Sequence, residues 1–206
     1  MLTLAVCLAG AGCRSTYYAM WEGLGKEKRD LLKDQVEEAK EDQQQASEQF
    51  KDALTRLKEL YGVDGGDLER AYNKLSGDYD KCDARAAQVQ DRIERMETIA
   101  ADLFREWEEE IETYSSANLK AGSQERLTET KVKYRALAAA MKKAESGMAP
   151  VLVQLKDQVL YLKHNLNAQA IGALRGEVVD IEKEIASLIQ DMNQSIAEAD
   201  AFIQTL

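Results

Sequence analysis

The sequence contains only one proline, three phenylalanines and one histidine in 206 residues. So little proline and phenylalanine is unusual for a compact mixed α/β or all-β enzyme of this length. A single histidine excludes a di-iron bundle, whose ligands include a Glu-x-x-His motif on each of two helices. No strand-turn-helix elbow presents a serine or cysteine nucleophile. We therefore expect no enzymatic activity, no catalytic residue, no metal ligand and no cofactor, and we identify no small-molecule substrate.

Basic charge and long apolar runs are also scarce. Lys and Arg number 27 against 37 Asp and Glu, so the formal net charge is −10. Nucleic-acid binding depends on clustered Lys and Arg that displace counterions from phosphates, and a nucleic-acid partner is therefore not expected. No stretch of about twenty apolar residues is present that would span a bilayer as a helix.

What the sequence does contain is an apolar residue every three or four positions over almost fifty residues. This spacing is the a/d pattern of a coiled coil, which forms a narrow apolar seam along one side of an α-helix. A neighbouring helix must cover such a seam. Cys82 falls on it, and there a free thiol behaves as a small hydrophobe. The seam residues are Leu68, Tyr72, Leu75, Tyr79, Cys82, Ala86, Val89, Ile93, Met96, Ala100, Leu103 and Trp107.

The same pattern recurs on three other segments, and the breaks between them are short. We expect helices over residues Lys26–Tyr61, Asp67–Tyr114, Gln124–His164 and Ala168–Gln204, separated by turns at 62–66, 115–123 and 165–167. Short turns between long amphipathic helices place neighbours antiparallel. The expected fold class is all-α: one elongated up-down-up-down four-helix bundle with coiled-coil-like packing, formed by residues 26–206.

Several local features qualify this prediction. Pro150 lies within the third helix, where it removes a backbone hydrogen bond, so we expect a kink there or a break and restart. Ser123 is the expected N-cap of that helix, and Asn165 suits a left-handed backbone after it. Val153 and Val179 extend the apolar faces of the last two helices beside the seam.

The N-terminus differs from the rest of the chain. Residues 1–13 are apolar, rich in small residues and uncharged, and they end in Ala11-Gly12-Cys13. This pattern is typical of a secretory signal with a bacterial lipobox, and it predicts lipidation of Cys13. Gly10 stands where a lipobox usually has Leu, and the missing basic n-region indicates a start upstream of Met1. The alternative is a short buried apolar segment.

Residues 14–25 form the expected tether between this segment and the bundle. It carries Tyr17-Tyr-Ala-Met-Trp21. Tyr and Trp favour the water–lipid boundary, which suggests an interfacial anchor. Packing of these aromatics on the end of the bundle is an equally good interpretation.

One stretch resembles a known family. Residues 157–171 read Asp-Gln-Val-Leu-Tyr-Leu-Lys-His-Asn-Leu-Asn-Ala-Gln-Ala-Ile, and together with Asp64-Gly-Gly-Asp-Leu-Glu69 and Tyr114-Ser-Ser116 they resemble the bacterial family named domain of unknown function 2959 (DUF2959). The resemblance covers the chain from about Cys13 to its end. It implies a Gram-negative secreted lipoprotein whose leader ends in Ala-Gly-Cys. It implies no activity, because the family has none assigned.

We therefore expect a non-enzymatic lipoprotein of the cell envelope that faces the periplasm and acts as a helical scaffold or adaptor. Arg14 rather than Asp after the cysteine implies retention at the outer membrane. The expected partners are the membrane, through the lipid anchor, and a protein or a second copy of the chain. The alternative is a soluble cytoplasmic coiled-coil protein that oligomerises through a residual seam. An enzyme would need a pocket near His164, the sole histidine.

Overall fold

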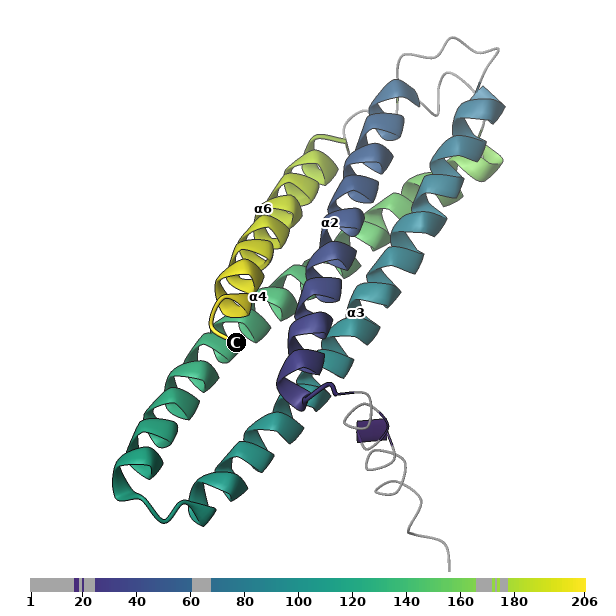
Figure 1. The fold of residues 1–206 in the computed structure, drawn as a ribbon. Coiled ribbons are helices and arrows are strands. Elements are labelled where there is room, and N and C mark those ends of the chain that lie inside the picture. Colours follow the sequence, from purple (N-terminus) through teal and green to yellow (C-terminus); the bar gives the residue numbers. More distant parts are fainter. Residues whose placement is uncertain are drawn as a thin grey trace, which may run out of the picture.

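The computed structural model describes residues 17, 18, 20, 25–60, 68–165, 172, 174 and 178–206. It contains four long α-helices, α2 (Lys28–Leu60), α3 (Leu68–Thr113), α4 (Ala117–His164) and α6 (Val178–Ile203). Successive helices run in opposite directions (Figure 1). Helix α2 packs against α3 and α6, and α4 packs against the same two helices. The expected all-α, up-down-up-down bundle is confirmed.

The predicted seams are the core of this bundle. The nine seam residues predicted by the periodicity of α2 are all buried, and Gln43 among them is fully enclosed. They are Leu32, Val36, Ala39, Gln43, Ala46, Phe50, Ala53, Leu57 and Leu60. In α3 and α4 most seam positions are buried, and Tyr72, Tyr79, Ala86, Trp107 and Tyr134 are partly buried and pack against the core. The seam of α6 is buried at Ile181, Ile185, Leu188, Met192 and Ala199. Each narrow stripe is therefore covered by its neighbours in the same chain.

One polar layer interrupts the apolar core. The Gln43 side chain of α2 donates a hydrogen bond from Nε2 to the Met141 carbonyl oxygen of α4 at 3.4 Å. Its Oε1 accepts a hydrogen bond from the Ser195 hydroxyl of α6. Because a buried amide is costly without partners, this glutamine constrains the relative positions of three helices.

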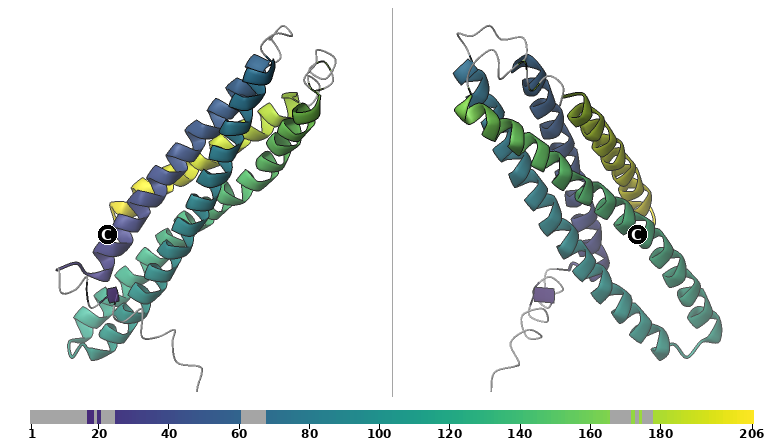
Figure 2. Two further views of the ribbon diagram at one scale, coloured as in Figure 1. Left: turned by 90° about the vertical axis from the view of Figure 1, so that its right-hand side faces the viewer. Right: turned by 180° about the vertical axis from the view of Figure 1, so that it is seen from behind.

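The four helices differ in length. Helices α3 and α4 have 46 and 48 residues, whereas α2 and α6 have 33 and 26. Lys28, the first residue of α2, contacts Glu106 of α3, and Phe202 near the end of α6 lies 5.7 Å from Tyr134 of α4 between ring centroids. Residues 107–133 therefore extend beyond both shorter helices as a two-helix element, the projecting hairpin (Figures 1 and 2).

The projecting hairpin has a small core of its own. Ile111 of α3 and Leu127 of α4 are buried in it, and the Trp107 indole N–H donates a hydrogen bond to the Ser123 hydroxyl at 2.9 Å. Lysines of α4 bridge to the acidic end of α3, Lys120 to Glu112 at 2.7 Å and Lys131 to Glu108. The glutamates that end α3 thus form part of a charged, solvated helix face.

The turn between α3 and α4 is shorter than predicted. Only residues 114–116 lie outside helix, and Ser116, not Ser123, caps α4, because its hydroxyl oxygen accepts a hydrogen bond from the Leu119 N–H at 3.5 Å. Ser123 instead lies inside the helix. Gly122 suggested a break, but it is exposed, and an exposed helical glycine costs only about 1 kcal/mol relative to alanine, which packing across the hairpin offsets.

Two smaller expectations are also corrected, and two others cannot be compared with the structure. The backbone of Asn165 has φ −133°, so it is not left-handed, and its side chain instead donates to the Tyr161 carbonyl oxygen at 2.9 Å. Val153 and Val179 are more than half exposed, because each lies outside the arc of its helix that faces the neighbours. The turn at 62–66 and the expected start of the last helix at Ala168 lie outside the described residues.

Helix α4 continues through Pro150, so a break and restart there is wrong. A kink within a continuous helix is compatible with this finding. Pro150 and Ser146 are both exposed, and water can therefore bond to the Ser146 carbonyl oxygen that the proline leaves without an N–H partner.

We expect Pro150→Ala to stabilise the protein by about 2 kcal/mol, because it restores one helical hydrogen bond at an exposed site. Urea denaturation followed by circular dichroism measures this free energy of unfolding. The matched control is Ala139→Pro, at an exposed position of the same helix, which should destabilise the protein by about 3 kcal/mol. Equal stability of Pro150→Ala and wild type would contradict the prediction.

Candidate functional site

Tyr18 of the tether packs against the bundle. This residue is 8% exposed, and its hydroxyl donates a hydrogen bond to Oδ2 of Asp102 in α3 at 2.6 Å. Asp102 is itself only 3% exposed, and Arg105 reaches its other carboxylate oxygen at 3.1 Å. Because a buried carboxylate is stable only when donors surround it, the tyrosine hydroxyl is part of what allows Asp102 to be buried.

Lys28 ties the same segment to α2. Its ammonium lies 4.9 Å from the centroid of the Tyr18 ring and also contacts Glu106 of α3. A cation over an aromatic face is attracted by the ring quadrupole. Between these residues Gly25 has φ +79°, a left-handed conformation that favours glycine. Tyr18, α2 and α3 therefore meet at one end of the bundle.

For Tyr18, the structure distinguishes between the two interpretations of the aromatic tether. Tyr18 packs on the end of the bundle, as the second interpretation predicted. Tyr17 and Met20 are 40% and 54% exposed. Trp21 and the lipidation candidate Cys13 lie outside the described residues.

A surface depression of about 650 Å³ lies beside Tyr18. Residues of α2 and α3 form its floor together with the tether tyrosines. Arg95 in its wall is 3.7 Å from Asp91, so this cation is already balanced. Among the described residues, no histidine, cysteine or serine lines the depression. The lining residues are Tyr17, Tyr18, Gln35, Asp91, Glu94, Arg95, Thr98 and Ile99.

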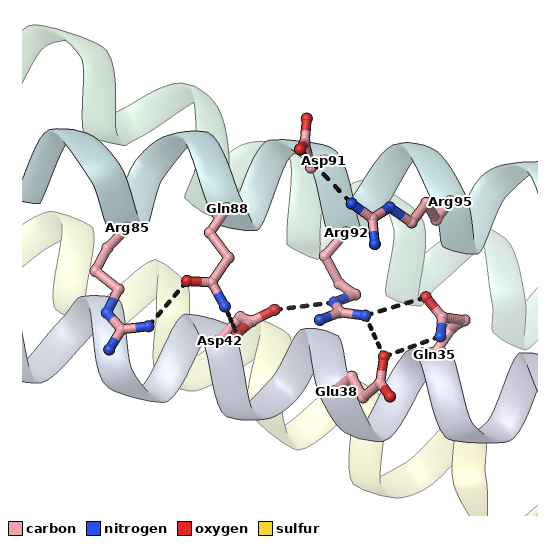
Figure 3. Close-up of polar contacts among 8 residues, drawn as sticks. All are labelled: Gln35, Glu38, Asp42, Arg85, Gln88, Asp91, Arg92 and Arg95. Carbon is pink, nitrogen blue, oxygen red and sulfur yellow. Dashed lines mark hydrogen bonds and ion pairs between the residues drawn. The ribbon is translucent and has the colours of Figure 1, made fainter.

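Next to this depression, a polar network joins α2 to α3 (Figure 3). Asp42 of α2 is 5% exposed and accepts hydrogen bonds from Gln88 Nε2 at 2.6 Å and Arg92 Nε at 2.9 Å. The Arg92 guanidinium also contacts Glu38 and lies 3.4 Å from Gln35 Oε1. Each carboxylate in the network is matched by donors, so it fixes the register of the two helices and presents no free nucleophile or base.

The buried aspartates were not predicted as functional residues. Asp42, Asp78 and Asp102 are each less than 9% exposed. Asp78 is paired with Lys81 at 3.2 Å and lies 3.6 Å from Arg56 of α2. The sequence does carry a signal for them, because each directly precedes a seam position, Gln43, Tyr79 and Leu103 respectively. At that position a side chain lies at the edge of the helix interface.

The remaining sequence candidates lie apart from this end of the bundle. His164 is exposed in the last turn of α4. Cys82 is fully buried in the core, where its thiol approaches the Gln49 carbonyl oxygen at 3.5 Å. Burial, with the nearby charges of Asp78 and Asp52, raises the pKa of the Cys82 thiol to about 12. The structure therefore does not bring these two residues together.

Neither a metal site nor a membrane-spanning helix is found in the part of the chain that the structure describes. No group of three or more His, Cys, Asp or Glu side chains is arranged to hold a metal ion there. Within the same residues, none of the helices combines the length and apolarity needed to cross a bilayer.

We expect the Cys82 thiol to resist alkylation by iodoacetamide at pH 8 in the folded protein and to react readily in 8 M urea. The thiolate is the reactive species, and a pKa near 12 leaves little of it at pH 8. Mass spectrometry of the peptide that contains Cys82 measures the modified fraction. Rapid modification under native conditions would mean that this part of the core opens.

We expect Tyr18→Phe to release the N-terminal segment, because a hydrogen bond to a buried carboxylate contributes about 2 kcal/mol. Trypsin should then cut after Lys28 about thirty times faster, since cleavage follows the population of the open form. Tyr114→Phe, at a tyrosine that is 44% exposed, is the control and should leave the rate unchanged. An unchanged rate of cleavage in Tyr18→Phe would show that the Tyr18 hydroxyl does not hold the tether on the bundle.

Comparison with known proteins extends the resemblance seen in the sequence. The family model described as "Protein of unknown function (DUF2959)" matches residues 17–206. The match begins four residues after Cys13, so it does not bear on that cysteine. No curated protein and no solved structure matches the chain. Since the match covers nearly all of the sequence, the chain belongs to the DUF2959 family of proteins of unknown function.

Proposed function

We propose that this protein is a non-enzymatic lipoprotein of the cell envelope, acylated at Cys13, whose bundle faces the periplasm as a scaffold or adaptor. The observation that carries the proposal is the order of features at the N-terminus. The sequence Ala11-Gly12-Cys13 ends five residues before Tyr18, and Tyr18 is held on α3 through Asp102. A lipid on Cys13 would therefore be joined to a rigid body by a very short tether.

The bundle suits a scaffold better than a catalyst. Its polar clusters are used in ion pairs between helices, such as Arg92 with Asp42. A helix of 48 residues spans about 70 Å at 1.5 Å per residue, which gives a long surface for partners. The sequence holds a single histidine, and that residue is far from the depression beside Tyr18. Arg14, rather than Asp, follows Cys13 and favours retention at the outer membrane.

The alternative, a soluble cytoplasmic coiled-coil oligomerisation protein, has less support. Oligomerisation through a residual seam requires apolar seam positions that the chain does not cover itself. In the described parts of α2, α3, α4 and α6, the predicted seam residues are buried or partly buried within one chain. A lipoprotein scaffold needs no such open seam.

The experiment is metabolic labelling with radioactive palmitate of cells that express the full chain from its natural start. Label should enter the wild-type protein and be lost in Cys13→Ala. Two matched controls use the other cysteines: Cys82→Ala, in the core, and Cys7→Ala, upstream of the lipobox-like segment. Both should keep the label.

Membrane fractionation of the same strains gives the second measurement. The wild-type protein should be recovered with the outer membrane, and Cys13→Ala in the periplasmic fraction. Equal labelling of wild type and Cys13→Ala, or recovery of the wild-type protein in the cytoplasm, would overturn the proposal.

A further inference from the structure

The projecting hairpin and Tyr18 lie at the same end of the molecule. Tyr18 is bonded to Asp102 of α3, and the turn of the hairpin follows Thr113 of the same helix. Thr113 is eleven positions after Asp102, so the turn begins about 17 Å beyond Asp102, the residue to which Tyr18 is bonded, at 1.5 Å per helical residue. The turn of the hairpin is therefore the part of the described chain that protrudes furthest along the bundle axis at this end (Figures 1 and 2).

The tether limits how far Cys13 can extend past that level. Tyr18 is five positions after Cys13, and a fully extended chain of five residues spans at most about 18 Å. This limit holds for any conformation of the tether. With the bundle upright, a lipid on Cys13 can reach a bilayer only if the hairpin turn lies at or close to the bilayer surface as well.

The turn itself has the composition of an interfacial surface. Residues 113–119 contain no charged side chain, and they present Leu119 and Tyr114, which are 63% and 44% exposed. The first charged residue after them, Lys120, is paired with Glu112 at 2.7 Å. Tyrosine is enriched at the water–lipid boundary, where an apolar ring and a polar hydroxyl are both accommodated.

From the reach of the tether and the composition of the turn, we propose that the tip of the projecting hairpin rests on the lipid surface and that Leu119 and Tyr114 enter its headgroup region. The occupant of this surface is a bilayer with zwitterionic headgroups. Glu109 and Glu110 are exposed about one turn behind the tip, and they would be repelled by an anionic surface. The inference rests on the proposed acylation of Cys13.

The lipid on Cys13 and the tip of the projecting hairpin together make a two-point attachment to the membrane. One hydrophobic anchor alone leaves a rod free to tilt about its tether. A second contact on the long axis, provided by the hairpin tip, would hold the bundle upright with α6 and the opposite ends of α2 and α4 away from the membrane.

The test uses the acylated full chain in vesicles of phosphatidylethanolamine and phosphatidylcholine. In a Cys82→Ala background, an environment-sensitive fluorophore is attached at Leu119→Cys. Matched labels are placed at Lys163→Cys, at the far end of α4, and at Ala139→Cys, on the side of α4; both positions are exposed. Mass spectrometry first establishes the acyl group on Cys13, and circular dichroism establishes that each variant is folded.

The Leu119 label should show a blue-shifted emission and several-fold stronger quenching by lipid-borne spin labels than the other two labels. Leu119→Glu, with the label moved to Asn118→Cys, should reduce this quenching to the level at Lys163→Cys. Vesicles that contain phosphatidylglycerol should reduce it as well.

Other outcomes separate this inference from the proposed function. An acylated, vesicle-bound protein whose Leu119 label stays in water would overturn the inference and leave the anchor intact. Stronger quenching at Ala139→Cys than at Leu119→Cys would mean that the bundle lies flat, which also overturns it. A chain without an acyl group on Cys13 would overturn both.

Discussion

Each helix of this protein has one narrow apolar stripe, and in the four-helix part of the bundle two neighbouring helices cover each stripe. Helix α2 shows the constraint most clearly, because its stripe contains Ala39, Ala46 and Ala53 and is completely buried. Small side chains allow close approach but contribute little apolar area. The ring of four helices therefore supplies a core that no pair of them could supply alone.

Polar contacts then determine how the stripes are aligned. An alternation of three and four residues can slide by one heptad with little loss of apolar contact. The buried Asp42 with Arg92, and Gln43 with Ser195, are satisfied only in one register. Breaking such a pair leaves a buried polar group without its partner, which is strongly unfavourable. These contacts make the register specific.

Periodicity predicted the long elements well because burial follows it directly. The ends of α2 and α3 lie within two residues of the predicted boundaries. The start of α4 was wrong by seven residues, because residues 115–123 were predicted as a turn although Ile111 and Leu127 pack across the hairpin and keep the segment from Ala117 helical. Tertiary packing of this kind outweighs the propensity of one exposed residue.

The contact between Tyr18 and the bundle was harder to predict from the sequence. Packing of the tether aromatics on the bundle was one of two interpretations, but which aromatic is buried could not be predicted, since the tether has no periodicity and the partner of Tyr18, Asp102, lies 84 positions away. The pairing depends on where two distant segments meet. By contrast, the thiol of Cys82 was correctly placed in the core, because it occupies a seam position.

Because the helices differ in length, the cooperativity of unfolding differs between the two ends of the molecule. In the four-helix part, every helix is supported on two sides, and its backbone hydrogen bonds break only when much of the core opens. In residues 107–133 each helix has one neighbour, so amide protons there should exchange through small local openings that leave the rest of the bundle intact. The end of the rod can thus adapt its shape to whatever it touches without loss of the fold behind it.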